Sequence, residues 1–316
     1  MVTQDLAASS ANFEDVKTAS DLYAAIQTIG EQVIESADAG NPLAAFDKGY
    51  LDTGTIVEKI LFNVAESTAY NKNANSGHTP VYPTPVVAYL NDWTAKDFWT
   101  AVNEDEARTV LVKGGDVADI TARVIGTLNN GEIDEDFTNY KALFKKFKDT
   151  AGWHSAGQII GQSTGIPALL NDIRNVVKGM TFKNTKYTQA QNYSYRVPRD
   201  EIRIVMPYEV VNAIMLSADK MEMLSRIFGL DADEIGDRII ETDDPANSDG
   251  TYNIYVTDVK TFGKWTRARA LNSAYNLAAG AQEYKLHTEA MFAYVKNFKA
   301  ACLTYMPTEQ ALTNEH

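Results

Sequence analysis

One run in the sequence has the residue types and spacing of a nucleophilic catalyst. Residues 161–165 read Gly-Gln-Ser-Thr-Gly and match the G-x-S-x-G pattern of a nucleophile elbow, in which a strained strand-to-helix turn exposes a serine hydroxyl. His287, with Asp231 or Asp258 as the acid, would complete the Ser, Asp, His chain order of such hydrolases. The run also fits a flexible glycine-rich loop, and no His-Gly-Gly-Gly segment precedes it. A serine hydrolase that uses Ser163 is one hypothesis for the function.

Other site chemistries find little support in the sequence. A zinc site needs closely spaced ligands, but Cys302 is the single cysteine and the histidines are far apart. No G-x-x-x-x-G-K-[ST] or G-x-G-x-x-G run is present to bind a phosphate. We therefore predict no metal site, no cofactor and, outside the Ser163 hypothesis, no catalytic residue. The histidines are His78, His154, His287 and His316.

The charge balance argues against a dedicated nucleic-acid-binding protein. The 316 residues include 42 acidic and 29 basic side chains, and the net charge of −13 repels phosphate backbones. Trp265, Arg267 and Arg269 combine an aromatic ring with basic residues, as single-strand binders do. Two arginines are too few to overcome the acidic chain, so we expect them to form salt bridges between subunits.

No segment predicts secretion or a membrane span. No run of about 18 apolar residues, the length of a spanning helix, occurs. The first 35 residues carry six acidic side chains and one basic one, whereas a signal peptide begins with basic residues. We expect a soluble protein made in the cytoplasm, without a membrane partner.

The elements that would position a site begin with an acidic N-terminal zone. Residues 1–52 carry nine acidic and two basic side chains, a net −7. Leu22, Ile26 and Ile29 follow the helical period, which predicts an amphipathic helix that ends at the turn 40–42. Two interpretations stay open: a loosely packed terminal arm, or an arm whose apolar face docks on a neighbouring subunit.

A long β-hairpin is predicted next. Residues 54–64 are rich in β-branched and aromatic residues, and residues 86–90 resume an extended pattern after a polar stretch at 71–80. A two-stranded hairpin cannot bury both faces against its own chain. It therefore needs a partner surface, although the chain's own core is the alternative for each apolar residue. The candidates for contact with a partner are Ile60, Phe62, Val86 and Tyr89.

Two amphipathic helices follow, separated by a turn at Asn130 and Gly131, residue types that often end a helix. The first begins at Asp116, and the second begins at Asp134 and directs aromatic residues inward and lysines outward. The lysine face is either solvated or meets acidic arms of neighbouring subunits. Its candidates for such contacts are Lys141, Lys145 and Lys146.

The rest of the chain mixes both kinds of element. Helices are predicted after Pro167 and Pro207, and strands at 202–206, 238–241 and 252–256. The last segment combines strand-like alternation with aromatic residues. Because helices and strands alternate without a regular βαβ pattern, an α+β fold is favoured over a doubly wound sheet.

The order of these elements resembles the tailed-bacteriophage major capsid protein, which has the HK-97-type shell fold. Three runs look like the junction between arm and hairpin in capsid proteins of phi-29-like short-tailed phages. They are Asn41-Pro-Leu-Ala-Ala-Phe46, Lys48-Gly49 and Gly54-Thr-Ile-Val-Glu-Lys-Ile60. The aromatic return strand, the helix pair and the helix after Pro167 follow in the same order.

The resemblance implies a division of the chain into five segments. They are an N-terminal arm (1–45), an extended hairpin loop (46–95), the first part of a peripheral domain with a long spine helix (96–166), an axial domain (167–281), and the closing strands of the peripheral domain with the C-terminus (282–316). A further immunoglobulin-like domain is not expected. The short arm implies a separate scaffolding protein.

The resemblance also implies a function. It predicts a major head protein that self-assembles into pentamers and hexamers of an icosahedral shell, with portal and other head proteins as partners. The shell would enclose double-stranded DNA without tight binding, in a virion assembled in the bacterial host cytoplasm. The expected subunit contacts are the apolar residues named above (Leu22, Ile26, Ile29, Ile60, Phe62, Val86, Tyr89) and the lysines (Lys141, Lys145, Lys146). A non-viral encapsulating shell of the same fold is an alternative, as is the hydrolase.

Overall fold

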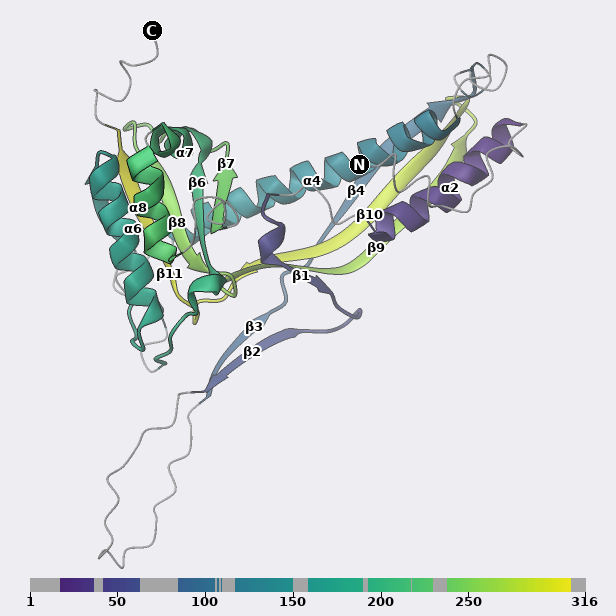
Figure 1. Cartoon of the computed structure of the whole chain (residues 1–316). Coiled ribbons are helices and arrows are strands. Elements are labelled where there is room, and N and C mark those ends of the chain that lie inside the picture. Colours follow the sequence, from purple (N-terminus) through teal and green to yellow (C-terminus); the bar gives the residue numbers. More distant parts are fainter. Residues whose placement is uncertain are drawn as a thin grey trace, which may run out of the picture. The chain divides into compact units, whose positions relative to one another are not determined.

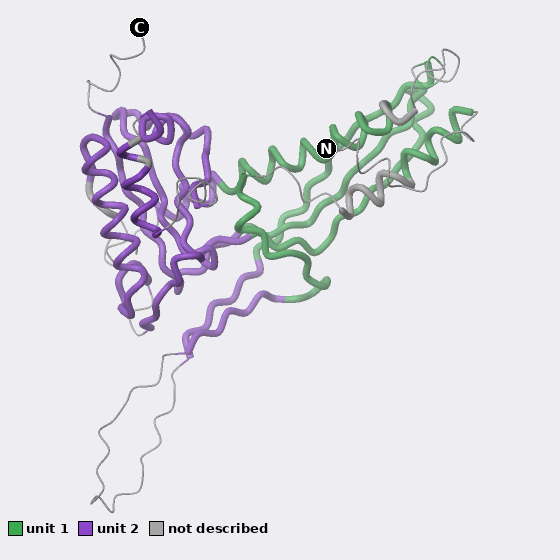
Figure 2. The backbone as a smooth tube through the Cα atoms, viewed as in Figure 1, with its two compact units in different colours: residues 1–55, 92–140, 264–292 green, residues 56–91, 141–263, 293–316 purple. Residues whose placement is uncertain are grey.

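The computed structural model mixes helices and strands (Figure 1) and divides into two compact units (Figure 2). Unit 1 comprises residues 1–55, 92–140 and 264–292, and unit 2 comprises residues 56–91, 141–263 and 293–316. The residues that the structure describes are 18–36, 42–62, 85–105, 107, 109, 117–149, 159–189, 193–216, 218–229 and 238–307, with only the backbone at 28–36, 117–119, 159–161, 218 and 221.

Unit 1 is built on a sheet with the strand order β1-β9-β10-β4. The strands are β1 (Asp47–Tyr50), β4 (Thr94–Asn103), β9 (Phe262–Asn276) and β10 (Ala281–Tyr294). β10 pairs antiparallel with β4, and β1 pairs parallel with β9. The long strand β9 was not predicted from the sequence. A short 3-10 turn, η2 (Ala44–Phe46), precedes β1.

The N-terminal helix α2 (Ala19–Ser36) packs into the core of unit 1. It begins with a reciprocal cap, in which the Asp21 N–H donates to Thr18 Oγ1 (3.2 Å) and the Thr18 N–H donates to the Asp21 carboxylate (2.9 Å). Its apolar side chains meet Val102 of β4 and Leu286 of β10 in one buried cluster. Local capping and long-range burial therefore both favour this helix.

The long helix α4 (Val117–Asp149) corrects the prediction of two helices, because it continues through Asn130 and Gly131. A Cβ at Gly131 would lie 3.3 Å from Phe98 Cδ1 of β4, so the glycine gives room to a neighbouring ring. Asn129 and Glu132 on either side are buried and hold Arg269 of β9. Tertiary packing thus overrides the local tendency of Asn-Gly to end a helix.

Unit 2 contains a sheet with the strand order β5-β11-β8-β6-β7. β11 runs parallel to β5 and antiparallel to β8, and β6 runs antiparallel to β8 and parallel to β7. The strands are β5 (Ile159–Thr164), β6 (Ile202–Pro207), β7 (Ile239–Thr242), β8 (Tyr252–Asp258) and β11 (Ala300–Met306). The helices of this unit are α6 (Ile166–Thr181), α7 (Tyr208–Met215) and α8 (Ala218–Phe228), with a 3-10 turn η3 (Arg199–Glu201) before β6.

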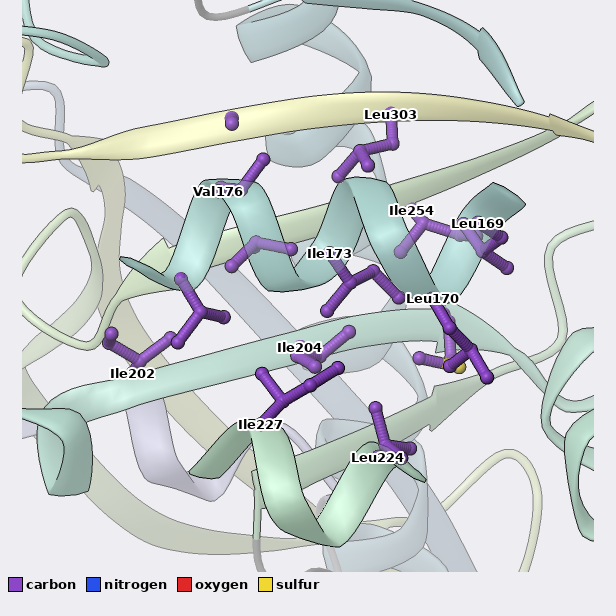
Figure 3. Packing of buried hydrophobic residues seen from close by; sticks show 14 of the residues in the cluster. Leu169, Leu170, Ile173, Val176, Ile202, Ile204, Leu224, Ile227, Ile254 and Leu303 are labelled. Carbon is purple, nitrogen blue, oxygen red and sulfur yellow. The ribbon is translucent and has the colours of Figure 1, made fainter. Parts of the chain in front are cut away.

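One face of this sheet is buried under α6 and α8 (Figure 3), and apolar residues of α7 belong to the same buried cluster. Leu170 and Ile173 of α6 and Ile204 of β6 have no exposed surface. On the other face, Phe144 of α4 stacks on Tyr255 of β8, with ring centroids 5.1 Å apart. Burial on both faces makes this sheet the principal core of unit 2.

Between Thr55 and Asp92 the chain forms the predicted hairpin. Strands β2 (Val57–Phe62) and β3 (Pro85–Leu90) run antiparallel side by side (Figure 1). The predicted polar stretch at 71–80 lies outside the described residues. The strands predicted near 202, 238 and 252 and the helix predicted after Pro167 are also present. No helix among the described residues is both long enough and apolar enough to cross a membrane.

Candidate assembly interface

The hairpin of β2 and β3 carries an apolar surface on one of its faces. Its register runs from Val57 opposite Leu90 to Phe62 opposite Pro85, and among the described strands the two pair only with each other. Alternation along each strand sorts the residues into two faces. We call the following residues the exposed hairpin face: Glu58, Ile60, Phe62, Pro85, Val87 and Tyr89.

The large side chains of the exposed hairpin face are open to solvent. The exposed fractions are 68% for Tyr89, 54% for Phe62, 46% for Ile60 and 38% for Val87. The Glu58 carboxylate accepts a hydrogen bond from the Tyr89 hydroxyl and raises the pKa of Tyr89. A contiguous apolar patch of this kind on a two-stranded ribbon is typical of a protein contact surface.

The predicted contact residues divide between the two hairpin faces. Ile60, Phe62 and Tyr89 share the exposed hairpin face, whereas Val86 lies opposite Leu61 on the other face and is half-buried. Strand alternation alone predicts which residues of one strand share a face, but the register between the strands is needed to match the faces of β2 and β3. The first three residues are therefore the ones that are available to a partner.

The predicted contacts of the N-terminal helix have a different environment. Leu22 and Ile26 are completely buried in the chain's own core, beside Val102 and Tyr284. The intrachain alternative therefore describes these two residues, and a partner could reach α2 only through its other side. The Ile29 side chain lies outside the described residues.

The lysine face of α4 is partly used within the chain. Lys141 Nζ lies 2.8 Å from Asp243 Oδ1, and Lys148 Nζ donates to Asn253 Oδ1 (2.7 Å). The first contact reaches the segment that follows β7, and the second reaches the start of β8. Lys145 and Lys146 are exposed.

The G-x-S-x-G run does form a strand, a turn and a helix, but no histidine of the described residues is a partner of its serine. Ser163 is buried at the end of edge strand β5 and donates a 2.6 Å hydrogen bond to Asp172 Oδ2 of α6. Gly165, with φ 78°, provides the turn into α6. The Asp172 carboxylate accepts a hydrogen bond from the Ser163 hydroxyl and fixes its orientation, which is a structural role for this serine.

The other members of the expected triad have partners of their own. His287 Nδ1 lies 2.6 Å from Asp97 Oδ1 on β4 of unit 1, where Lys285 and His287 lower the pKa of Asp97. Asp258 accepts from the Tyr195 hydroxyl (3.1 Å), and burial raises its pKa. Asp231 lies outside the described residues. The described residues therefore assemble no serine triad.

The arginines that were expected to bridge subunits are paired within the chain, which corrects that prediction. Arg267 Nε lies 2.5 Å from Glu289 Oε2, and Arg269 Nη2 lies 2.7 Å from Glu132 Oε2. Arg267 also lies over the Trp93 ring, with its Cζ 4.9 Å from the ring centroid. These partners could not be predicted from the sequence, because they are 22 or more residues away.

Sequence reasoning missed a buried ionic cluster in unit 1. Asp136 and Glu132, one helical turn apart on α4, flank Lys264 of β9, and Lys264 forms an ion pair with Asp136. Burial raises the pKa of Asp136 to about 6, against the effect of the Lys264 ammonium. Two carboxylates spaced i and i+4 inside a helix were the signal that could have indicated it.

No group of His, Cys, Asp and Glu side chains among the described residues is arranged to hold a metal ion. Cys302 is buried in β11, and burial raises the pKa of its thiol to about 12, which leaves it unreactive. The exposed hairpin face, where four large apolar side chains lie together on one ribbon, is the candidate interface among the described residues.

The fold is that of phage capsid chains. It is similar to a chain of the capsid of Staphylococcus phage Andhra, with a TM-score of 0.59 at 12% identity over 83% of each chain. It is also similar to a chain in a structure of the head fiber and inner core protein gp22 of native bacteriophage P68, with a TM-score of 0.54 at 11% identity over 84% of each chain. The predicted mixed fold of the capsid type is confirmed.

Sequence comparison identifies the family of the chain. Residues 3–304 match the family of Phi29-like phage major capsid proteins, and the chain belongs to that family. It is 22% identical to the major capsid protein of Bacillus phage B103 over 213 residues, which are 66% of this chain and 47% of the phage protein. The chain thus spans about half the length of that curated relative.

Proposed function

We propose that this chain is the shell-forming subunit of a phage head, and that copies of it bind one another through the exposed hairpin face. The observation that carries the proposal is the family match over residues 3–304, joined to an apolar face that the described chain leaves open. Each Ile, Phe or Val side chain buried between subunits contributes about 1.5–3 kcal/mol. Several such residues repeated around closed rings supply a driving force for assembly.

The assembly has further expected features. The copies form pentamers and hexamers of an icosahedral shell, helped by a separate scaffolding protein and joined by portal and other head proteins. The shell encloses double-stranded DNA inside the virion and is built in the bacterial host cytoplasm. The net charge of −13 supports a coat that does not hold the genome's phosphates tightly.

A role as an enzyme is not part of the proposal. The buried Ser163 hydroxyl, bound to Asp172, supports a structural serine. Incubation of the purified chain with a fluorophosphonate should leave Ser163 unlabelled. Labelling that disappears in Ser163→Ala would instead favour the hydrolase.

The direct test is particle formation. The full chain, expressed with and without the scaffolding protein of its phage, is examined by electron microscopy and sedimentation velocity. Closed shells of uniform size are expected. A chain that stays monomeric under both conditions would overturn the proposal, and shells that enclose host protein instead of DNA would favour the non-viral alternative.

The predicted arm, residues 1–45, calls for a truncation that spares α2. Because Leu22 and Ile26 are core residues, removal of 1–40 would damage unit 1 itself. Removal of residues 1–17 leaves α2 and its Thr18 cap in place. Loss of assembly by a folded truncated chain is the expected result, and unimpaired shells would count against an arm that bridges subunits.

A further inference from the structure

The sheet of unit 1 ends in a long strand with an open edge. β4 is the outermost strand, and its ten residues pair in unbroken register with β10. On its other side, β4 makes no backbone hydrogen bond to any described residue, and most of its residues are exposed. The far side of the sheet differs, because β1 pairs with β9 and Gln27 Nε2 of α2 donates to the Leu271 carbonyl of β9 (3.0 Å).

Edge strands usually carry features that prevent pairing with another chain, such as prolines, bulges and outward charges. β4 contains no proline and no bulge. Its two charged side chains are held by partners within its own unit. Lys96 Nζ lies 2.9 Å from Glu135 Oε1 of α4, and Asp97 Oδ2 lies 2.8 Å from Lys285 Nζ of β10. The edge of β4 is therefore a template on which a further strand can pair.

Helix α4 limits what can be added to this edge. It lies over one face of β4, where Lys96 reaches Glu135 and where a Cβ at Gly131 would lie 3.3 Å from the Phe98 ring. Neighbouring strands lie about 4.8 Å apart, but packed helices need about 8–10 Å between their axes. A sheet with its own helix on that side does not fit, whereas a bare ribbon does. The β2–β3 hairpin is such a ribbon, since none of its residues belongs to either buried hydrophobic cluster.

Of the two hairpin strands, β3 suits the open edge better. It carries no charged side chain, whereas β2 carries Glu58 and Lys59. The link from β3 to β4 also favours pairing between copies over pairing within one copy. Trp93 of that link lies against Arg267 of β9, so its side chain points toward the inner strands and away from the open edge. A return of β3 along β4 of its own chain would break this contact.

We propose that β3 of one copy adds to the open edge of β4 in a second copy, so that the hairpin extends the sheet of unit 1. The inference rests on the proposed self-assembly and names the surface that receives the hairpin. Peptide groups along both strands then form hydrogen bonds at the contact. On the face of β4 away from α4, Trp99 and Ala101 are exposed, and Val87 and Tyr89 of the second copy lie beside them. In a closed ring, each copy gives one strand and receives one.

Cysteine cross-linking between two differently substituted copies tests the contact. The native Cys302 is buried, so new exposed cysteines report on their own neighbours. Opposite side chains on paired strands lie about 4.5–5.5 Å apart, which a disulfide can bridge. One copy carries Val87→Cys, and the other carries one substitution on β4: Ala95→Cys, Asp97→Cys, Trp99→Cys or Ala101→Cys.

Oxidation of mixed shells should join the two copies at one or two of these positions. The matched control is Ala278→Cys, at an exposed alanine between β9 and β10, and it should not cross-link. The position that reacts gives the register of the added strand. No cross-link at any of the four positions on β4 would overturn the proposal.

A charge placed at the edge should block the added strand. Ala101→Lys introduces a long cation where an apolar side chain of the second copy would lie, and should raise the threshold concentration for shell formation at least about tenfold. Ala278→Lys adds the same charge elsewhere in unit 1 and should assemble as the wild type does. Thermal melting of unassembled subunits checks that each variant folds, and Ala95→Lys replaces Ala101→Lys if the latter does not. Equal thresholds for the edge variant and the control would contradict the strand addition.

Hydrogen exchange separates a failure of this inference from a failure of the proposed function. In shells, the backbone amides of both 85–90 and 94–103 should exchange more slowly than in unassembled subunits. Slower exchange at 85–90 alone would place the hairpin on another surface and overturn the proposal. If the wild type forms no shells, the proposed function fails. A peptide with the sequence of residues 84–91 should still slow exchange at 94–103 of the unassembled subunit, and no such effect would overturn the edge as a binding surface.

Discussion

The two-stranded hairpin and the five-stranded sheet of unit 2 contain the same kinds of apolar residue but bury them to different extents. Ile204 of β6 is completely buried, whereas Ile60 of β2 is 46% exposed. Helices α6 and α8 cover one face of the larger sheet, and aromatic residues of α4 meet the other. No residue of the exposed hairpin face belongs to either buried hydrophobic cluster that the described residues form. The larger sheet therefore forms the core of unit 2, whereas the hairpin leaves apolar area exposed, which the proposed assembly would bury.

If the buried sheet of unit 2 is the main source of stability, a core substitution there should lower the free energy of unfolding strongly. Leu170→Ala removes a fully buried side chain of α6 and should lower the free energy of unfolding by about 2–5 kcal/mol. Urea unfolding of the unassembled subunit measures the loss. Leu216→Ala, at a position that is 81% exposed, is the control and should change stability little. Equal effects of the two substitutions would contradict the assignment of the core.

The hairpin should show the opposite behaviour. Ile60→Ser combined with Phe62→Ser should leave the unfolding free energy within about 0.5 kcal/mol of the wild type, because both side chains are already exposed. The threshold concentration for assembly should rise by at least about tenfold. Light scattering across a concentration series measures it, and Phe182→Ser, an exposed aromatic in unit 2, is the control. Normal shells from the double variant would remove the hairpin from the interface.

The buried ions of unit 1 add a dependence on pH. Burial raises the pKa of Asp136 from 3.8 to about 6. A carboxyl with a raised folded pKa stabilises the fold below its unfolded value, and that contribution is lost as pH rises through the folded value. Between those two values, wild-type stability should therefore fall with pH relative to Asp136→Asn. Denaturant unfolding at several pH values tests this, with Asp134→Asn on the exposed side of α4 as the control. Parallel profiles for wild type and Asp136→Asn would refute it.

The smallest expected effects belong to the lysine face of α4. Lys141→Gln breaks a partly exposed ion pair with Asp243 and should cost about 0.2–1 kcal/mol of stability. Lys145→Gln should cost less, because that side chain is exposed. If this face meets acidic segments of other copies, the triple Gln variant at 141, 145 and 146 should change how assembly depends on salt. An unchanged salt dependence would leave the lysines with intrachain roles alone.

Much of the local structure followed from the sequence. The β-branched runs of the hairpin, the helical spacing after Pro167 and the short alternating strands act over a few residues, and the structure contains each of them. The runs between Asn41 and Ile60 also carried the resemblance to capsid proteins, and the family match confirms it. These features depend on neighbours along the chain, which a sequence displays directly.

Tertiary structure decided the rest, because the deciding partners are distant in sequence. Phe98 makes Gly131 a site of close packing inside α4 instead of its end. Lys264 reaches Asp136 across 128 positions, and Lys141 reaches Asp243 across 102. The apolar character of Leu22 and Ile26 fits both a core position and a subunit contact. Their packing against the sheet of unit 1 is what places them in the core. The sequence by itself determined which segments are apolar, and the fold determined which of them remain exposed, because burial depends on what packs against each face.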